Sequence, residues 1–219
     1  MNVLLFGATG MVGQGVLREC LLDADVTGVL AVVRQPSGRR HPKLRELMHA
    51  DFYDYSAIES ELTGFDACLF CLGVSSAGMP AERYRRITCD LTLAAATTVA
   101  RLNPAMTFIY VSGMGTDNTG RARTGWGRVK GETEKALLRL PFRAAYMFRP
   151  GLIVPLDGIK SKTLWYRVFY IATGPVLPWL AKAIPSLVTT TAQVGRAMLA
   201  VAKHGAPNPI LENSDINRI

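Results

Sequence analysis

The chain has 219 residues, a net charge of +8, 49% hydrophobic residues and 19% charged residues. This composition is ordinary for a soluble globular protein, and the length suits one domain, residues 1–219, with a sizeable core. The basic residues are scattered apart from two short groups at 34–45 and 83–86, so we do not expect nucleic acid to be a partner. The N-terminus resembles a strand rather than a secretory signal, which predicts a cytoplasmic protein.

Strand-like and helix-like segments alternate along the chain. Near-continuous apolar runs predict strands, and apolar residues at helical spacing predict helices. The predicted strands cover residues 2–7, 26–34, 46–51, 66–73, 106–113 and 142–151. The predicted helical segments cover residues 11–22, 55–62, 80–102, 127–140 and 191–204. Because the strands look buried on both faces, the pattern predicts an α/β fold, a Rossmann-like doubly wound parallel sheet with helices on both faces.

Residues 151–219 are interpreted as a small C-terminal substrate-side region of the same domain, with a polar tail at its end. The charge-free segment 168–181 is too short to span a bilayer and contains helix-breaking residues. The region 164–188 is therefore a candidate for a membrane-surface contact, a protein interface or a cap over a substrate pocket. Cys68 and Cys71 lie three apart on a predicted strand and point to opposite faces, so we expect buried thiols and no metal site.

The segment GATGMVG follows the first predicted strand and opens a helix, with glycines at Gly7, Gly10 and Gly13. This context is typical of a dinucleotide-binding turn. The first glycine allows a sharp turn, the second lets the backbone approach a pyrophosphate, and the third lets the helix pack closely on the strand. The helix N-terminus then offers free N–H groups to the phosphates.

The end of the second predicted strand carries Arg34, followed by Arg39 and Arg40. NAD-binding folds have an acidic residue near this point, whereas a guanidinium suits the 2′-phosphate of NADP. The pattern therefore favours NADP over NAD. At the end of the third predicted strand, Asp51 is either a ligand of the adenine amino group or the start of a turn.

These motifs, with Ser112, Lys130 and the "FRPG" at 148–151, resemble the short-chain dehydrogenase/reductase superfamily. The resemblance is to its atypical, epimerase-like, NAD(P)-binding branch, which includes the Tat-interacting-protein-like and NmrA-like members, and it covers most of the chain. It implies that Ser112 orients the substrate and that Lys130 bonds the nicotinamide ribose and lowers the pKa of a tyrosine.

The tyrosine that this superfamily places four residues before the lysine is replaced here by Trp126. An indole N–H is a hydrogen-bond donor that does not ionise usefully near neutral pH, so it does not replace the phenol in proton transfer. Trp126 is either a wall of the site or an aromatic residue that packs on a loop. Tyr110, Asp117, water and Ser112 are the alternative donors.

Two functions stay open at this point. One is an NADP-dependent oxidoreductase or epimerase acting on a small carbonyl or alcohol, with Ser112, Lys130 and Trp126 at the catalytic position. The other is a non-catalytic protein that senses NADP and binds a partner. The residues expected to contact the cofactor are Gly7, Thr9, Gly10, Met11, Val12, Gly13, Arg34, Asp51, Phe52, Cys71, Leu72, Gly73, Lys130 and Pro150.

Overall fold

The computed structural model describes residues 1–120, 124–159 and 186–219. These ranges form a parallel sheet in the order β3-β2-β1-β4-β5-β6-β9 and a small parallel pair, β7-β8. The strands are β1 (Asn2–Phe6), β2 (Gly28–Val33), β3 (Leu44–Met48), β4 (Ala67–Phe70), β5 (Thr107–Val111), β6 (Ala144–Arg149), β7 (Leu152–Val154), β8 (Val188–Thr190) and β9 (Ile210–Glu212). The helices are α1 (Met11–Leu22), η1 (Ser56–Leu62), α2 (Ala81–Arg85), η2 (Arg86–Asp90), α3 (Leu91–Leu102), α4 (Gly125–Leu137), α7 (Thr191–His204) and α8 (Asn213–Arg218).

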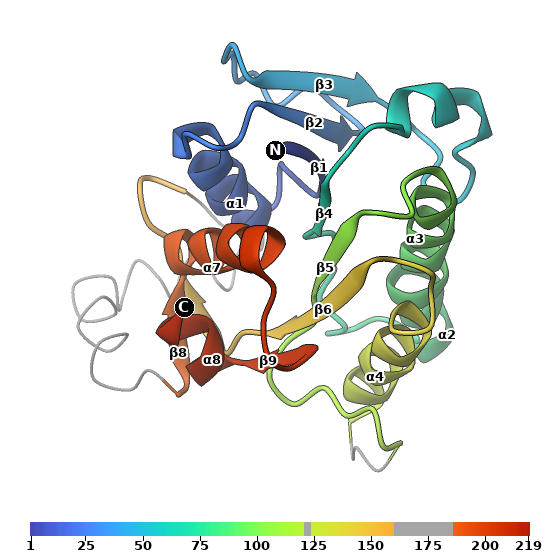
Figure 1. Ribbon diagram of the computed structural model, residues 1–219. Helices are drawn as coiled ribbons and strands as arrows, with labels where there is room; N and C mark the ends of the chain where they lie inside the picture. The colour runs from blue at the N-terminus through green and yellow to red at the C-terminus, as the bar shows by residue number, and fades with distance from the viewer. Residues whose placement is uncertain (121–123, 160–185) are drawn as a thin grey trace.

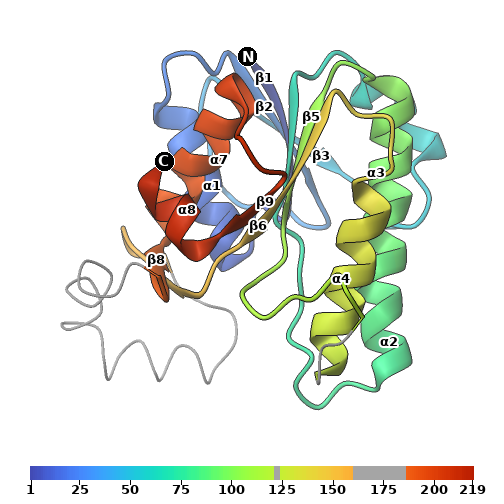
Figure 2. The same ribbon diagram turned by 60° about the horizontal axis from the view of Figure 1, so that its bottom comes forward.

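The helices cover both faces of the main sheet. In Figures 1 and 2, α1 and α7 lie on one face, and α3 and α4 lie on the other. In chain order, β1 lies in the middle of the sheet, and β2 and β3 extend it to one side. The chain then returns to the middle, and β4, β5, β6 and β9 extend the sheet to the other side. The predicted doubly wound parallel fold is therefore confirmed.

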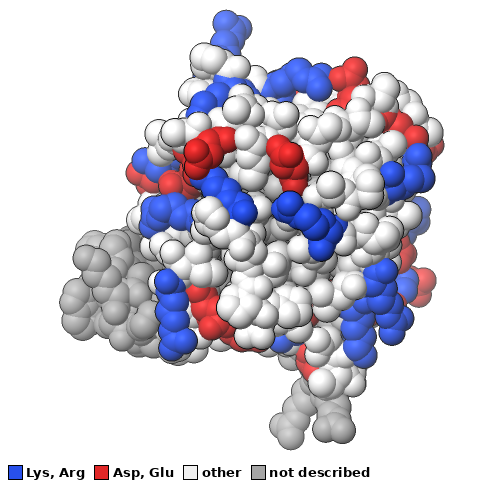
Figure 3. Space-filling model, in the orientation of Figure 1, with Lys and Arg blue, Asp and Glu red and all other residues white. Residues whose placement is uncertain are grey.

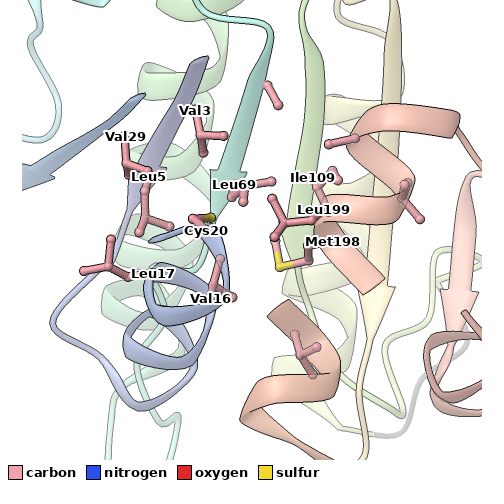
Figure 4. Close-up of a cluster of buried hydrophobic side chains, with 14 of the residues drawn as sticks. Val3, Leu5, Val16, Leu17, Cys20, Val29, Leu69, Ile109, Met198 and Leu199 are labelled. Atoms are coloured by element: carbon pink, nitrogen blue, oxygen red, sulfur yellow. The ribbon is translucent and has the colours of Figure 1, made fainter. Parts of the chain in front are cut away.

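The core on the α1–α7 side consists mainly of aliphatic side chains that the strands and the two helices contribute together. Figure 4 shows Leu5 of β1 and Ile109 of β5 beside Val16 of α1 and Met198 of α7, all fully buried. Burying one such side chain stabilises the fold by about 1.5–3 kcal/mol. The opposite face has a second cluster, built around aromatic residues such as Phe6, so both faces of the sheet are covered by apolar packing.

Glycines bring α1 and α7 into close contact. A Cβ at Gly15 of α1 would lie 2.6 Å from Cβ of Thr191, and one at Gly195 of α7 would lie 2.7 Å from Cγ of Glu19. Both distances are shorter than side chains tolerate, so neither position accepts a larger residue without movement. The helix α7 thus packs closely on α1 beside the main sheet, and Gly151 and Ile153 of the same C-terminal region line the cavity described below.

Some elements differ from the sequence prediction. The third strand runs over Leu44–Met48, earlier than the predicted 46–51, because its register is set by pairing of Leu44 with Val29 of the buried strand β2. The predicted helix 80–102 contains a π-helical segment, η2. The polar tail forms β9, which pairs with β6, and the short helix α8. Cys68 and Cys71 contact the cores on opposite faces of the sheet, as predicted.

The apolar segment 168–181 lies outside the described residues, as does all of 164–188 except 186–188. Among the helices that the structure describes, none is both long enough and apolar enough to span a membrane. Figure 3 shows basic side chains spread among acidic ones on the face that it displays. This distribution does not test nucleic-acid binding, and we still expect that nucleic acid is not a partner.

Candidate dinucleotide site

A cavity of about 670 Å³ opens at the carboxyl ends of the central strands. It is bounded by the glycine-rich turn after β1, the loops after β4, β5 and β6, and the first turns of α4. In open parallel sheets, ligands bind at the carboxyl ends of the strands, at the point where the strand order reverses. The sequence-predicted residues that line the cavity are Gly10, Met11, Val12, Cys71, Leu72, Gly73, Ser112, Trp126, Lys130 and Pro150.

The turn between β1 and α1 has the geometry that a dinucleotide-binding turn needs. Gly7 has a φ of +83°, and a Cβ there would lie 2.7 Å from the backbone carbonyl of Cys71. A Cβ at Gly13 would lie 2.0 Å from the carbonyl oxygen of Gly7. These two glycines therefore shape the turn and the helix packing from behind the cavity, and Gly10 lies at the cavity itself.

The N-terminus of α1 has no internal cap. Gly10 is the N-cap residue, no side chain caps the helix, and the first turn has no acidic residue. Met11 and Val12, whose backbone N–H groups belong to this first turn, line the cavity. Uncapped N–H groups and the positive end of the helix dipole attract phosphate oxygens, so the residues fit the pyrophosphate of a dinucleotide.

Other predicted cofactor residues lie outside the cavity wall. Thr9 is half-buried in the turn. Arg34 is exposed directly after β2. Because Phe6 pairs with Val32, the carboxyl ends of β1 and β2 lie side by side, so Arg34 lies at the same end of the strands as Gly7. Asp51 accepts a hydrogen bond from the backbone N–H of Tyr53 at 2.9 Å, which is the geometry of the turn-starting alternative.

Phe52 also differs from its predicted place. It is buried in the aromatic cluster, with its ring 6.3 Å from that of Phe6, and it does not line the cavity. Its aromatic neighbours come from β1 and from the segment before η1, so sequence spacing alone does not reveal this packing.

Lys130 and Ser112 meet at the cavity wall. The Lys130 Nζ donates a hydrogen bond to the backbone carbonyl oxygen of Ser112 and lies 5.9 Å from the ring centroid of Tyr110. Burial disfavours the charged form and lowers the pKa of Lys130 to about 8, although the negative charge of Glu134 opposes this shift. The side chain is therefore an amine that exchanges protons near neutral pH.

The hydroxyl of Ser112 is held by a buried carboxylate. Its Oγ lies 2.6 Å from Oε1 of Glu134 and 3.1 Å from the carbonyl oxygen of Phe148. A hydroxyl has one proton, and the shorter contact to the charged acceptor is the stronger one. The proton of Ser112 is thus directed at Glu134, and the oxygen keeps its lone pairs for other groups.

Glu134 belongs to an ion-pair network that sequence reasoning missed. It is fully buried, and its two oxygens accept hydrogen bonds from Nε and Nη2 of Arg149 at 3.0 and 2.6 Å. Arg149 also pairs with Glu212 of β9 at 2.9 Å. Burial opposes the charge of Arg149, but the hydrogen bonds and negative charges of Glu134 and Glu212 together outweigh it and raise the pKa of the guanidinium. An arginine within the apolar strand 144–149 was the available signal of a buried partner.

Trp126 combines the two alternatives that the sequence left open. It lies in the first turn of α4 and lines the cavity with Lys130, one helical turn away. It also packs on the loop after β5: a Cβ at Gly115 would lie 3.2 Å from Cη2 of the indole. The indole therefore packs on this loop and also forms part of the cavity wall.

Tyr84 is a cavity residue that sequence reasoning missed. It comes from α2, is 3% exposed and lines the cavity. Burial raises the pKa of its phenol. Its sequence context, within a long amphipathic helix, carried no signal that distinguishes it from a core aromatic residue.

The turn, the uncapped helix and the polar groups at the strand ends define a Rossmann-type protein that binds a dinucleotide. Residues 7–140 match the family model described as NAD(P)H-binding, and the chain belongs to this family. The fold is shared with an oxidoreductase of the short-chain dehydrogenase/reductase family from Burkholderia thailandensis, with a TM-score of 0.70 and 16% identity over 98% of this chain and 92% of that chain. It is shared also with the Bordetella bronchiseptica enzyme WbmH in complex with NAD⁺, with a TM-score of 0.69 and 14% identity over 96% of this chain and 75% of that chain.

Among sequence relatives, "Protein fmp52-2, mitochondrial" of Aspergillus oryzae is 27% identical over 98% of this chain and 95% of its own length. "Protein fmp52, mitochondrial" of Emericella nidulans is 28% identical over 69% of this chain and 66% of its own length. Their mitochondrial names contradict the predicted cytoplasmic location, which was wrong. Secretory-signal features bear on export alone and do not distinguish the cytoplasm from the other compartments of a cell.

Proposed function

We propose that this chain is an NADP-dependent oxidoreductase or epimerase-like enzyme that acts on a small carbonyl or alcohol. One observation carries the proposal: a single cavity joins the uncapped N-terminus of α1 to Ser112, Trp126 and Lys130. A bound nicotinamide dinucleotide supplies or accepts the hydride, and the chain positions the substrate and handles the proton. The B. thailandensis neighbour, named an oxidoreductase, is consistent with this class.

The proposed preference for NADP rests on charge at the ribose end of the site. Arg34, Arg39 and Arg40 are exposed in the segment after β2. The part of this segment nearest to the β2 end, Arg34 to Pro36, contains no carboxylate that would repel a 2′-phosphate. Guanidinium groups bind phosphates through charge-assisted hydrogen bonds.

Trp126 supports a second candidate, a non-catalytic protein that binds NADP and reports its state to a partner. The indole occupies the wall position next to Lys130 and does not transfer a proton near neutral pH. In that case the cavity would bind the cofactor without turnover.

One experiment distinguishes the two candidates. The purified protein is titrated with NADPH by fluorescence and then assayed for NADPH oxidation with 4-nitrobenzaldehyde, 9,10-phenanthrenequinone and a panel of aliphatic aldehydes and ketones. Turnover that depends on the protein supports the enzyme. Tight NADPH binding with no oxidation by any carbonyl supports the sensor, and absence of NADPH binding contradicts both.

A further inference from the structure

We propose that Lys130 is the proton donor of this site and gives an ammonium proton directly to the oxygen of a carbonyl substrate. The inference rests on the proposed reductase function and deepens it. It assigns to the lysine the step for which the adjacent Trp126 has no ionisable group.

The proton inventory of the cavity leads to this assignment. In the described part of the chain, no carboxylate or imidazole lines the cavity. The ionisable side chains there are Cys71, Tyr84 and Lys130. Burial raises the pKa of the Cys71 thiol and of the Tyr84 phenol, which makes both weaker acids, and burial makes the Lys130 ammonium a stronger one. A general acid works best when its pKa lies near the working pH.

The hydrogen bonds around Ser112 remove its hydroxyl as a proton donor to a substrate. Its hydroxyl proton is directed at Glu134 over 2.6 Å, and Glu134 is fixed in turn by Arg149. The backbone carbonyl of Ser112 accepts a hydrogen bond from Nζ of Lys130 and holds the lysine at the cavity wall. An ammonium has three protons, so the lysine keeps donors for a substrate while it is held in place.

The reduced dinucleotide supplies a hydride to the carbonyl carbon and is oxidised, while the substrate is reduced to an alcohol. The π electron pair of the C=O bond moves to oxygen, which takes one proton from the Lys130 ammonium. The N–H bond breaks, an O–H bond forms, and the neutral amine regains a proton from water, whose hydroxide is neutralised by a proton of the bulk solvent.

Groups on neighbouring elements do not account for titration near pH 8. The ionisable groups that face α4 from the elements packed against it are Tyr84 of α2, Cys89 of η2 and Tyr110 of β5. Arg149 of β6 contacts α4 through its ion pair with Glu134. An exposed ion pair between Arg85 and Glu132 joins α2 to α4. Burial raises the pKa of Tyr84, Cys89 and Tyr110 above their ordinary values. A titration at this pH therefore reports Lys130.

The first test needs no cofactor. Trinitrobenzenesulfonate labelling of the free protein is followed at Lys130 by peptide mass spectrometry as a function of pH, with N-acetyl-lysine amide in the same tube as the reference amine. Labelling of Lys130 should rise with a midpoint near pH 8, where the pKa lies. A midpoint equal to that of the reference amine overturns the proposal.

The second test uses the best carbonyl probe from the panel with saturating NADPH. The kcat/KM of the native protein should fall about tenfold per pH unit above pH 8, because the ammonium is lost. Lys130→Arg keeps a cation and hydrogen-bond donors but does not release a proton near neutral pH. It should lower kcat/KM about a hundredfold or more while the Kd for NADPH changes by a few-fold at most. Tyr84→Phe should keep the alkaline limb near pH 8.

The outcomes separate this inference from the proposed function. No NADPH oxidation by the native protein with any carbonyl ends both. Turnover that survives in Lys130→Arg, or an alkaline limb that disappears in Tyr84→Phe, leaves the reductase standing and overturns the role of Lys130. An equal loss of NADPH affinity and of kcat/KM in Lys130→Arg makes the lysine a binding group and also overturns it.

Discussion

Ser112 Oγ lies 2.6 Å from Oε1 of the fully buried Glu134. This contact joins the cavity wall to an ion pair in the interior, because the carboxylate also accepts two hydrogen bonds from Arg149. A buried charge that loses its partner is costly, so the position of Ser112 depends on a network that reaches as far as Glu212 of β9.

Glu134→Gln should therefore destabilise the fold by about 3–5 kcal/mol, because it leaves the Arg149 guanidinium without its main buried counter-charge. Glu132→Gln is the matched control on the same helix. It breaks an ion pair with Arg85 whose side chains are 46% and 50% exposed, so its cost should stay within about 1 kcal/mol. Urea unfolding of the two variants measures the difference, and equal changes would contradict the buried network.

Lys130 should make stability depend on pH. Its folded pKa of about 8 lies below the ordinary 10.5, so between these values the unfolded chain binds more protons than the folded one. Stability from this group is therefore lowest below pH 8 and rises as pH increases to 10.5. Relative to Lys130→Met, the native protein should gain about 2–3 kcal/mol across that window. Urea unfolding at pH 7 and pH 10.5 tests this; a constant difference between the two proteins argues against the shift.

Arg34→Ala should remove most of the preference for NADPH over NADH. One charge-assisted contact with a phosphate contributes about 1.5–3 kcal/mol, so the native preference should be roughly tenfold or more. Arg139→Ala is the control, because it changes the net charge equally at an exposed position. Arg139 follows the end of α4 that lies away from the cavity. Fluorescence titrations with both cofactors measure the ratio, and equal affinities in the native protein would refute the NADP assignment.

Gly10→Val should abolish NADPH binding and leave a folded chain. A Cβ at Gly10 has one near neighbour, the Gly7 carbonyl oxygen at 3.3 Å, and the branched side chain would extend into the cavity that Gly10 lines. Gly13→Ala should instead destabilise the fold, because its Cβ would lie 2.0 Å from the same oxygen. Thermal unfolding and NADPH titration of both variants give the contrast. Normal NADPH binding by Gly10→Val would show that the phosphates of the cofactor do not bind at this turn.

Trp126→Tyr places a phenol one helical turn from the Lys130 ammonium, on the wall that both residues share. If the native protein lacks turnover, the variant should gain NADPH-dependent reduction of an aldehyde, since the nearby cation favours the phenolate and lowers the tyrosine pKa. If the native protein is active, the altered wall should lower its kcat/KM. Steady-state kinetics decide between these results, and a folded, NADPH-binding variant with unchanged rates would make Trp126 a packing residue only.

Local sequence was enough for most of the fold. The helices at 11–22 and 191–204 appear with the predicted bounds, because their apolar periodicity coincides with the face that packs on the sheet. The third strand was misplaced and β9 was missed. Both lie at the edges of the sheet, where half-exposed residues carry a weak pattern and pairing with a neighbour sets the limits.

The same division holds for the site. The turn residues Gly7 and Gly13 were predictable, since backbone geometry and close packing are local demands that only glycine meets there, and the same motif placed Gly10 at the cavity. The sequence likewise placed Lys130 one turn from Trp126. Tertiary structure alone decided that Glu134 binds Ser112 and Arg149, that Tyr84 reaches the cavity, and that Phe52 does not. Those contacts join residues from separate elements, and their formation depends on how helices and strands pack, which residue spacing does not encode.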